Sequence, residues 1–246
     1  KEKNLLLIED CCESHGAEHP GTGWDSKKIG TFGDMSNFSF YFGHHITTVE
    51  GGMVCTNNSK LYDLLKLLRS HGMTREGSTE VQDNYKKHYP HLNPLFTFAV
   101  PGLNFRNQEI NAVLGLSQLN RLDWNCHRRI SNLHIWLTAL DGERYFTDFN
   151  KAGNSSFALP LISKKSDRMD KICNLLEEEQ VEYRKGMAGG GNQSLQPYLQ
   201  NGLYEYKISG ELRNTNLIHF CSLYVGNHPD LTKGQIAELA YKLNHV

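Results

Sequence analysis

The stretch SFYFGHHITTVEGGMV, from Ser39 to Val54, has the pattern of a strand, a sharp turn and a second strand that Gly-Gly opens. His44 and His45 are adjacent in the turn. Polar residues in such turns often have catalytic roles. The nearest lysines are Lys28 on one side and Lys60 on the other. We therefore expect a strand–turn–strand unit whose turn carries histidines and has no lysine beside it.

Composition indicates the class of protein. The chain has 246 residues, 39% hydrophobic and 22% charged, with a net charge of −1, which is an ordinary soluble mixture. No basic stripe indicates a nucleic-acid surface, and no run reaches the roughly 18 apolar residues of a membrane span. The first residues, KEKNLLLIED, lack the pattern of a signal peptide. The six cysteines form no C-x-x-C pair, so we expect reduced, mostly buried thiols in a cytoplasmic protein.

The first half of the chain predicts alternating strands, turns and helices. A buried strand is expected over Leu5–Ile8, and because buried parallel strands need neighbours on both sides, we expect the chain to begin inside a larger domain. The Gly-rich segment GTGWDSKKIGTFGD fits a hairpin or loop. A helix is predicted from Ser59, which can cap it, to a stop at Gly72. Residues 73–103 are expected to be irregular, and a further helix to begin at Asn107.

The second half predicts a small α+β domain. A helical run is expected to continue to about Leu140, and a last helix to begin at Leu231. Between them the sequence predicts strands at FALPLI, VEYR and LIHFCSLYV, with a helix at SDRMDKICNLLEEEQ after the first strand.

Two residues at predicted strand ends are candidates for binding a cofactor. Asp10 ends the first strand, and in open α/β sheets ligands bind beyond the carboxyl ends of strands. A carboxylate there can pair with a protonated ring nitrogen, as in pyridoxal-phosphate enzymes. Ser39 can bind a phosphate together with neighbouring backbone N–H groups. On the residues alone, a helix N-cap or loop acid and a turn-satisfying serine are the more ordinary explanations.

A metal site is the alternative chemistry for the N-terminal region. The residues Cys11, Cys12, His15 and His19 lie close together in sequence, and the two histidines are four residues apart. Adjacent cysteines point in different directions, however, and no second Cys or His pair lies at zinc-finger spacing. We therefore expect no metal site.

Four motifs together resemble one family. They are EDCCESHGA (9–17), IGTFGDMSNFSFYFGHHITTVEGGMV (29–54), PGLNFRNQEINAVLGLSQLNRLD (101–123) and LYVGNHPDLT (223–232). In this order they resemble the sugar aminotransferase family of pyridoxal-phosphate enzymes, over nearly the whole chain. The resemblance implies the α/β fold of type I, as in aspartate aminotransferase. Residues 1–123 would be the C-terminal portion of the large cofactor-binding domain and residues 124–246 the small α+β domain, with an N-terminal part missing.

The histidine turn resembles a branch of that family. Its aminotransferases carry a lysine at the position of His44, and that lysine links covalently to the cofactor. Imidazole offers no primary amine for this link, but it can act as a general base. The HHIT…EGG pattern resembles the 3-dehydratase branch, which uses pyridoxamine phosphate to remove the C3 hydroxyl of a nucleotide-linked 4-keto-6-deoxyhexose, with glutamate as an amino donor. An aminotransferase of the same family and a truncated, non-catalytic homologue remain the alternatives.

The resemblance also implies roles for individual residues. Asp10 would pair with the pyridine nitrogen, Glu13 would lie near the ring 3′-oxygen, Ser39 would bind the phosphate and His44 would be the base. Asn104 would reach the cofactor phosphate of a neighbouring subunit, which implies a homodimer.

Further implications concern the substrate and a metal cluster. Arg184 and His219 are candidates for substrate contact, with a surface arginine and a core histidine as the alternatives. Val49 stands where the family commonly has glycine. Because Cys55 is followed by no cysteine until Cys126, we expect the branch without an iron–sulfur cluster.

Overall fold

The computed structural model describes residues 5–19, 21 and 27–246. The chain divides into two compact units, Lys1–Leu122 and Asp123–Val246, one residue from the expected boundary. That the first unit is the C-terminal portion of a larger domain stays a prediction. Among the described residues, no helix combines the length and apolar character that crossing a membrane requires.

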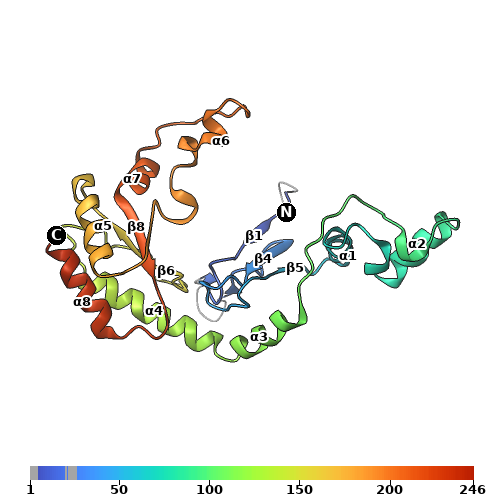
Figure 1. Ribbon diagram of the computed structural model, residues 1–246, viewed down its shortest axis with the longest axis horizontal. Helices are drawn as coiled ribbons and strands as arrows, with labels where there is room; N and C mark the ends of the chain where they lie inside the picture. Colours follow the sequence, from blue (N-terminus) through green and yellow to red (C-terminus); the bar gives the residue numbers. More distant parts are fainter. Residues whose placement is uncertain (1–4, 20, 22–26) are drawn as a thin grey trace. The chain divides into compact units, whose positions relative to one another are not determined.

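The first unit contains a three-stranded mixed sheet of order β1-β4-β5, in which β1 runs parallel and β5 antiparallel to β4 (Figure 1). Its strands are β1 Ile8–Asp10, β4 Met35–Ser39 and β5 Gly52–Cys55. A second antiparallel pair joins β2 Glu18–His19 to β3 Lys27–Lys28, of which only β3 lies in the segment 21–34 expected to be a hairpin or loop. Residues 22–26 of that segment lie outside the described part of the chain.

The register of this sheet positions the candidate site. Asp10 lies opposite Asn37, and Ser39 lies opposite Gly52. Because successive side chains of a strand point to opposite faces, Asp10, Asn37 and Ser39 share one face of the sheet. Glu9 belongs to the other face.

The expectation of a buried strand over Leu5–Ile8 is wrong for this chain. The strand begins only at Ile8, and the side chains of Leu5 and Ile8 are 78% and 59% exposed. In the described part of the chain β1 pairs with β4 alone, so it is an edge strand. An apolar run is buried only where neighbouring elements cover it.

The helices of the first unit follow the sheet. They are α1 Ser59–Leu68, α2 Thr79–His88 and α3 Glu109–Leu119, with 3-10 turns at Thr74–Glu76 and Pro94–Phe96. The cap of α1 is Asn58, not Ser59, because the Asn58 side chain accepts from the amides of Lys60 and Leu61. Gly72 lies beyond the end of the helix at φ +80° and donates to the Leu67 carbonyl over 2.8 Å.

Helix α2 corrects the expectation that residues 73–103 are irregular. Its sequence, TEVQDNYKKH, is polar and none of its residues is buried, so apolar periodicity could not reveal it. Ser78 caps it by accepting from the Val81 amide, and Ser78 is held in turn by the Asp63 carboxylate, with N···O and O···O distances of 2.8 Å.

The connection from β4 to β5 contains a strained residue. The Phe40 amide donates to the Gly51 carbonyl and the Thr48 amide to the Phe40 carbonyl, both over 2.9 Å, which closes the loop that carries the histidines. Val49 lies in this loop at φ +72°, in the left-handed region that disfavours β-branched residues. Its side chain is 63% exposed, so little packing compensates for the strain.

The second unit is a small α+β domain, as expected. Its strands are β6 Ala158–Ile162, β7 Tyr183–Lys185 and β8 Ser222–Gly226, in the antiparallel order β6-β8-β7. Its helices are α4 Leu122–Ala139, α5 Met169–Glu178, α6 Pro197–Gln200, α7 Arg213–Cys221 and α8 Lys233–Asn244, with 3-10 turns at Ser166–Arg168, Ala188–Gly190 and Gln193–Leu195. LIHFCSLYV is therefore a strand only from Ser222, and its first part belongs to α7, contrary to the expectation.

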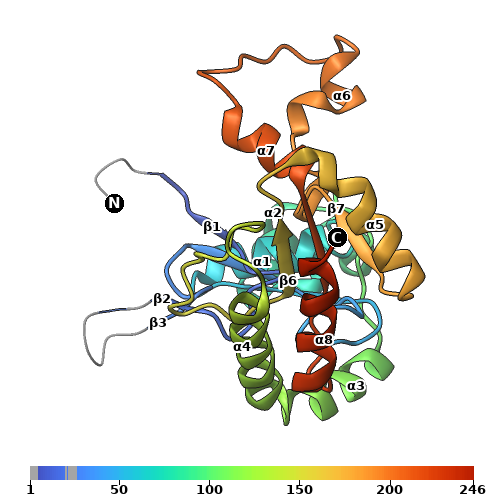
Figure 2. The same cartoon turned by 90° about the vertical axis from the view of Figure 1, so that its left-hand side faces the viewer.

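The core of the second unit lies between its sheet and three helices. Leu159 and Leu161 of β6 and Leu223 and Val225 of β8 point to one face, where they pack with α4, α5 and α8. Figures 1 and 2 both show α4 and α8 side by side against this sheet. The indole of Trp136, fully buried, donates to the Pro160 carbonyl over 2.7 Å. This packing fixes the sheet on the helices.

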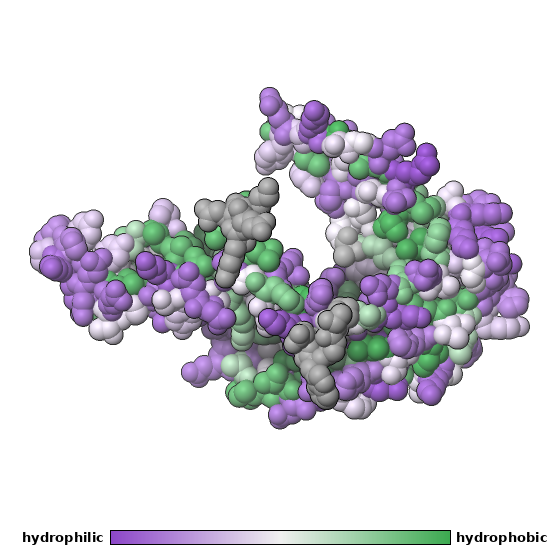
Figure 3. All heavy atoms as spheres, turned by 180° about the vertical axis from the view of Figure 1, so that it is seen from behind, coloured by the Kyte–Doolittle hydropathy of each residue, from purple (hydrophilic) through white to green (hydrophobic). Residues whose placement is uncertain are grey.

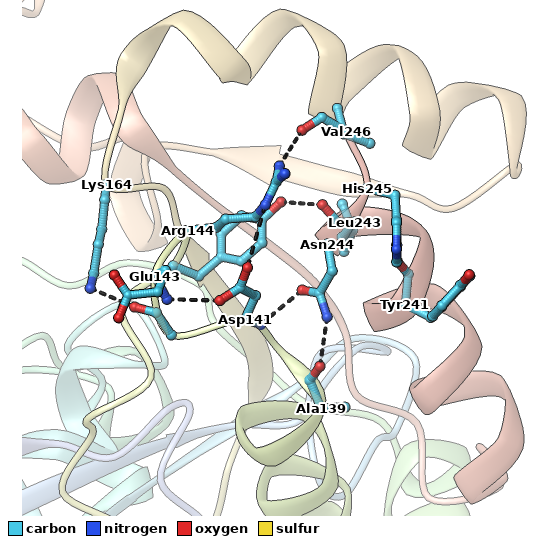
Figure 4. A network of polar contacts seen from close by, with 12 residues as sticks. Ala139, Asp141, Glu143, Arg144, Lys164, Tyr241, Leu243, Asn244, His245 and Val246 are labelled. Carbon is cyan, nitrogen blue, oxygen red and sulfur yellow. Dashed lines mark hydrogen bonds and ion pairs between the residues drawn. The ribbon is translucent and has the colours of Figure 1, made fainter.

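The end of α8 is tied to the loop that follows α4 (Figure 4). The Tyr145 hydroxyl donates to the Leu243 carbonyl over 2.6 Å, and burial raises the pKa of this phenol. The Asn244 side chain accepts from the Asp141 amide and donates to the Ala139 carbonyl, both over 2.8 Å. The last helix is therefore held by specific polar contacts as well as by the core.

The motif LYVGNHPDLT has a structural role in this unit. Buried Asn227 donates to the carbonyls of Arg129 and Ser156 over 3.0 and 2.9 Å, and it accepts from the Asn132 amide over 3.0 Å. A capping box of Thr232 and Gln235 then starts α8. The turn after β8 is thus fastened to α4.

We predict that Asn227→Ala lowers the free energy of unfolding by about 1–3 kcal/mol, because it leaves buried backbone and amide groups without a partner. Urea unfolding followed by far-UV circular dichroism measures the change. Asn214→Ala, at an exposed position of α7, is the control and should shift it by less than about 0.5 kcal/mol. Equal small effects of both variants would contradict the structural role.

We also predict that Val49→Gly raises the free energy of unfolding by about 1 kcal/mol. The gain is the left-handed strain of a β-branched residue minus the extra chain entropy of glycine. Val54→Gly, at a half-exposed position of β5, is the control and should lower stability by about 1 kcal/mol. A lower stability of Val49→Gly would show that the valine is not strained.

Candidate functional site

Asp10 lies at the carboxyl end of β1 and is bound by two neighbours. Its Oδ1 accepts from the Cys12 amide over 3.2 Å and from the Asn37 side-chain amide over 3.0 Å. The largest cause of a lowered pKa of the Asp10 carboxyl is a side-chain hydrogen bond from Cys12, followed by the bond from the Cys12 amide. Partial burial raises this pKa, and the hydrogen bond from Asn37 lowers it. The carboxyl therefore ionises below its ordinary range and remains exposed to a ligand.

Glu9 supports the strand from its other face, a role that the sequence motifs did not reveal. Its carboxylate accepts from the amides of Gly30, Phe32 and Gly33 over 2.6–2.7 Å. Partial burial raises the pKa of the Glu9 carboxyl, but the three N–H groups together lower it by more than burial raises it. The net shift of this pKa is therefore downward. Glu9 thus holds the 30–33 segment against β1. These contacts span 21 to 24 residues, so no local sequence pattern could reveal them.

Ser39 ends β4 on the face that carries Asp10. Its Oγ accepts from the Tyr41 amide over 3.3 Å, so this serine does satisfy the turn, as one explanation held. A hydroxyl keeps one hydrogen to donate in addition to what it accepts. The turn bond and a phosphate contact are therefore compatible.

His44 points its ring back at the strand end. Its Nδ1 lies 3.3 Å from the Ser39 carbonyl oxygen. A carbonyl only accepts, so Nδ1 carries the hydrogen in this contact, and in the neutral ring the lone pair is then on Nε2. The half-buried imidazole is therefore oriented by the backbone of the residue expected to bind phosphate.

His45 differs from its neighbour in burial. It is only 2% exposed, and its ring centroid lies 5.7 Å from that of His15, which is itself buried. His15 also contacts the rings of Phe38 and His44, at 5.3 and 6.4 Å. Among the described residues, no three His, Cys, Asp or Glu side chains are grouped so that they could hold a metal. His15 and His45 therefore form part of an aromatic cluster beneath the turn.

Glu13 and Asn104 both belong to the first unit. Glu13 lies half-buried in the turn that follows β1, where the Ser14 amide donates to the Cys11 carbonyl. Asn104 is exposed and forms an antiparallel bridge with Ser70. Both assigned roles stay predictions.

Arg184 and His219 belong to the second unit. Arg184 lies exposed on β7 opposite Tyr224, on the sheet face that points away from the core. Half-buried His219 lies on α7, and its Nδ1 accepts from the Asn192 amide over 3.2 Å, which places the ring hydrogen on Nε2. A Cβ on Gly191 would collide with this ring.

His219 lines a cleft of about 890 Å³ in the second unit. Lys185, Arg213 and Asp170 also line it, so the cleft has charged groups of both signs. Apolar residues such as Met169, Leu217 and Phe220 line it as well. The candidate residues therefore form two groups, one in each unit.

The comparisons with known proteins agree with the motifs. The chain is 32% identical over 244 residues to GDP-4-keto-6-deoxy-D-mannose 3-dehydratase of Yersinia pseudotuberculosis, covering 96% of this chain and 59% of that protein. It is similar to the solved structure of the E. coli GDP-4-keto-6-deoxy-D-mannose-3-dehydratase with bound hydrated PLP, with a TM-score of 0.79 and 27% identity. That match covers 97% of this chain and 60% of that one.

A more distant structure shows the fold alone. PseC, an aminotransferase of Helicobacter pylori, is 22% identical with a TM-score of 0.77, covering 98% of this chain and 59% of that one. The chain thus spans about three-fifths of the length of these relatives. The fold-type-I expectation is confirmed. The family model matches residues 1–244, and the chain belongs to the DegT/DnrJ/EryC1/StrS aminotransferase family.

Proposed function

We propose that this protein takes part in the 3-dehydration of a nucleotide-linked 4-keto-6-deoxyhexose with pyridoxal or pyridoxamine 5′-phosphate, and that His44 is the base. The observation that carries the proposal is the sheet face on which Asp10 and Ser39 lie, with His44 in contact with the Ser39 carbonyl. The 3-dehydratases among the relatives, two of them named for the GDP-linked sugar, support it.

The residues present fit the cofactor. A carboxylate that ionises below its ordinary range, as Asp10 does, suits a protonated ring nitrogen. The Ser39 hydroxyl can donate to a phosphate oxygen, and Glu13 lies in the turn directly after the Asp10 strand. One relative of known structure holds PLP. We therefore assign Asp10, Ser39 and Glu13 to cofactor binding.

His44 would handle the proton. Bound pyridoxamine phosphate would supply an amine for the sugar keto group and a ring that withdraws electrons from the reacting carbon. With Nδ1 donating to the Ser39 carbonyl, Nε2 of His44 can take up a proton and return it to the leaving hydroxyl. Because imidazole forms no covalent link of the lysine kind, His44 would leave the cofactor unlinked, and glutamate is the proposed donor of its amine.

The sugar nucleotide would meet residues of the second unit. Arg184 and His219 are proposed substrate contacts, since a guanidinium suits a diphosphate and Nε2–H of His219 suits a sugar oxygen. A solved variant of GDP-4-keto-6-deoxymannose-3-dehydratase, 26% identical and with a TM-score of 0.79, holds GDP-perosamine.

Aminotransfer is the second candidate function, because relatives also include GDP-perosamine synthase of E. coli O157:H7, 29% identical over 185 residues. It requires a lysine that can bind the cofactor. Position 44 has histidine instead, so product analysis with glutamate present should give the 3-deoxy sugar and not an amino sugar.

We predict that His44→Asn lowers the dehydration rate by about 10²-fold or more, the usual contribution of a positioned base, while cofactor binding is retained. Steady-state assay of the full-length protein with pyridoxamine phosphate, glutamate and GDP-, CDP- and dTDP-linked 4-keto-6-deoxy sugars measures this. His44→Lys should instead hold pyridoxal phosphate covalently at residue 44 after borohydride reduction, visible by mass spectrometry.

His45→Asn is the matched control for the adjacent position. His45 is buried, whereas His44 is half-buried. The His45→Asn variant should therefore lower the free energy of unfolding, and its effect on the dehydration rate should be small. If His45→Asn abolishes turnover and His44→Asn does not, the base is His45. If both variants turn over normally, proton transfer at this turn is refuted.

The proposal includes a homodimer. Asn104 is exposed, and the apolar side chains of α3 that follow it are exposed too, with Ile110 at 70% and Val113 at 66%. Figure 3 shows green, apolar side chains on the part of the surface where α3 lies. These residues are suited to burial against a second copy.

We predict a dimer in sedimentation experiments at micromolar concentration, weakened by Val113→Glu because a charge would then be buried in the interface. Glu238→Gln, at an exposed position of α8, should leave association unchanged. A monomeric wild-type protein would refute the dimer.

A further inference from the structure

Asn37 bridges two groups beside the proposed cofactor site. Its Nδ2 donates to Asp10 Oδ1 over 3.0 Å and to Cys12 Sγ over 3.2 Å, which uses both amide hydrogens. The Cys12 amide donates to the same Asp10 oxygen over 3.2 Å. Asp10, Cys12 and Asn37 therefore form a closed triangle of polar contacts.

The triangle follows from the sheet register. Asp10 and Asn37 are directly opposite in the parallel pair β1–β4, so their side chains lie on the same face. Cys12 is the second residue after the strand, where an Asx turn brings its amide back to the carboxylate. Two different elements thus converge on one carboxylate.

We propose that Cys12 and Asn37 are positioning residues that hold Asp10 for the ring nitrogen of the cofactor. This inference rests on the proposed function, since it assigns a partner to Asp10. An exposed aspartate alone would sample several rotamers, and fixing it in advance saves the entropy of ordering it on binding. The contacts also leave the carboxylate ionised, as pairing with a protonated nitrogen requires.

The chemistry of the Cys12 thiol fits this role. Burial, followed by the hydrogen bond to Asp10, raises the pKa of Cys12 to about 11, so the thiol stays protonated at neutral pH and acts as a donor. The acidic Glu13, next to Cys12 in sequence, also raises the pKa of the thiol. The thiol therefore remains a hydrogen-bond donor to the Asp10 carboxylate.

The first test needs no cofactor. Carbon-13 NMR of the Asp10 carboxyl gives its titration in the wild type, Cys12→Ala and Asn37→Ala. Each variant should move the midpoint upward, because a donor to the charged form is lost. Cys12→Ser keeps a donor and should stay near the wild type. Cys55→Ala, whose side chain lies on the opposite sheet face, is the control and should change nothing. Unchanged midpoints in both Ala variants would overturn the inference.

The second test adds pyridoxal phosphate to the folded proteins. Binding measured by absorbance should weaken about tenfold in Cys12→Ala and in Asn37→Ala, with Cys12→Ser near the wild type. The pH at which the bound cofactor's spectrum changes should fall, because a loosened Asp10 holds the ring proton less well. Weaker binding with an unchanged spectral midpoint would mean a merely structural role and overturn the inference.

The two tests separate two kinds of failure. If wild-type protein takes up no pyridoxal phosphate while the Asp10 midpoints shift as expected, the proposed function fails and the positioning of Asp10 stands. If the cofactor binds and the Asp10 midpoints do not move, the positioning fails and the proposed function stands.

Discussion

The parallel pairing of β1 with β4 is the constraint on which the candidate site depends. It places Asp10 opposite Asn37 and, two residues further along β4, puts Ser39 on the same face. A slip of one residue between the two strands would put Asp10 on the face opposite to that of Asn37 and Ser39. The pairing therefore decides whether a carboxylate, an amide and a hydroxyl meet at one edge of the sheet.

Contacts on both sides stabilise this arrangement. On the far face the Glu9 carboxylate holds the 30–33 segment through three backbone amides. Beyond Ser39 the loop closes on Phe40 and brings the His44 ring to the Ser39 carbonyl. The strain at Val49 belongs to the same loop. The site is thus a strand end whose neighbours are fixed before any ligand binds.

Local sequence patterns predicted the strands around the histidine turn, and the motifs predicted the family. The local patterns failed where tertiary contacts determine the secondary structure. Helix α2 has no apolar stripe, so periodicity missed it, and the apolar residues before His219 suggested a strand where the chain forms α7. The Asp10–Asn37 contact spans 27 residues. No local pattern contains such a cross-strand register, which is why Asn37 was not among the predicted site residues.

The most direct measurement is a crystal structure of the protein with pyridoxamine phosphate. We predict the ring nitrogen within hydrogen-bonding distance of the Asp10 carboxylate, a phosphate oxygen on Ser39 Oγ, and His44 Nε2 facing the amine-bearing carbon. A cofactor bound elsewhere, or one whose ring nitrogen faces away from Asp10, would refute the proposed site.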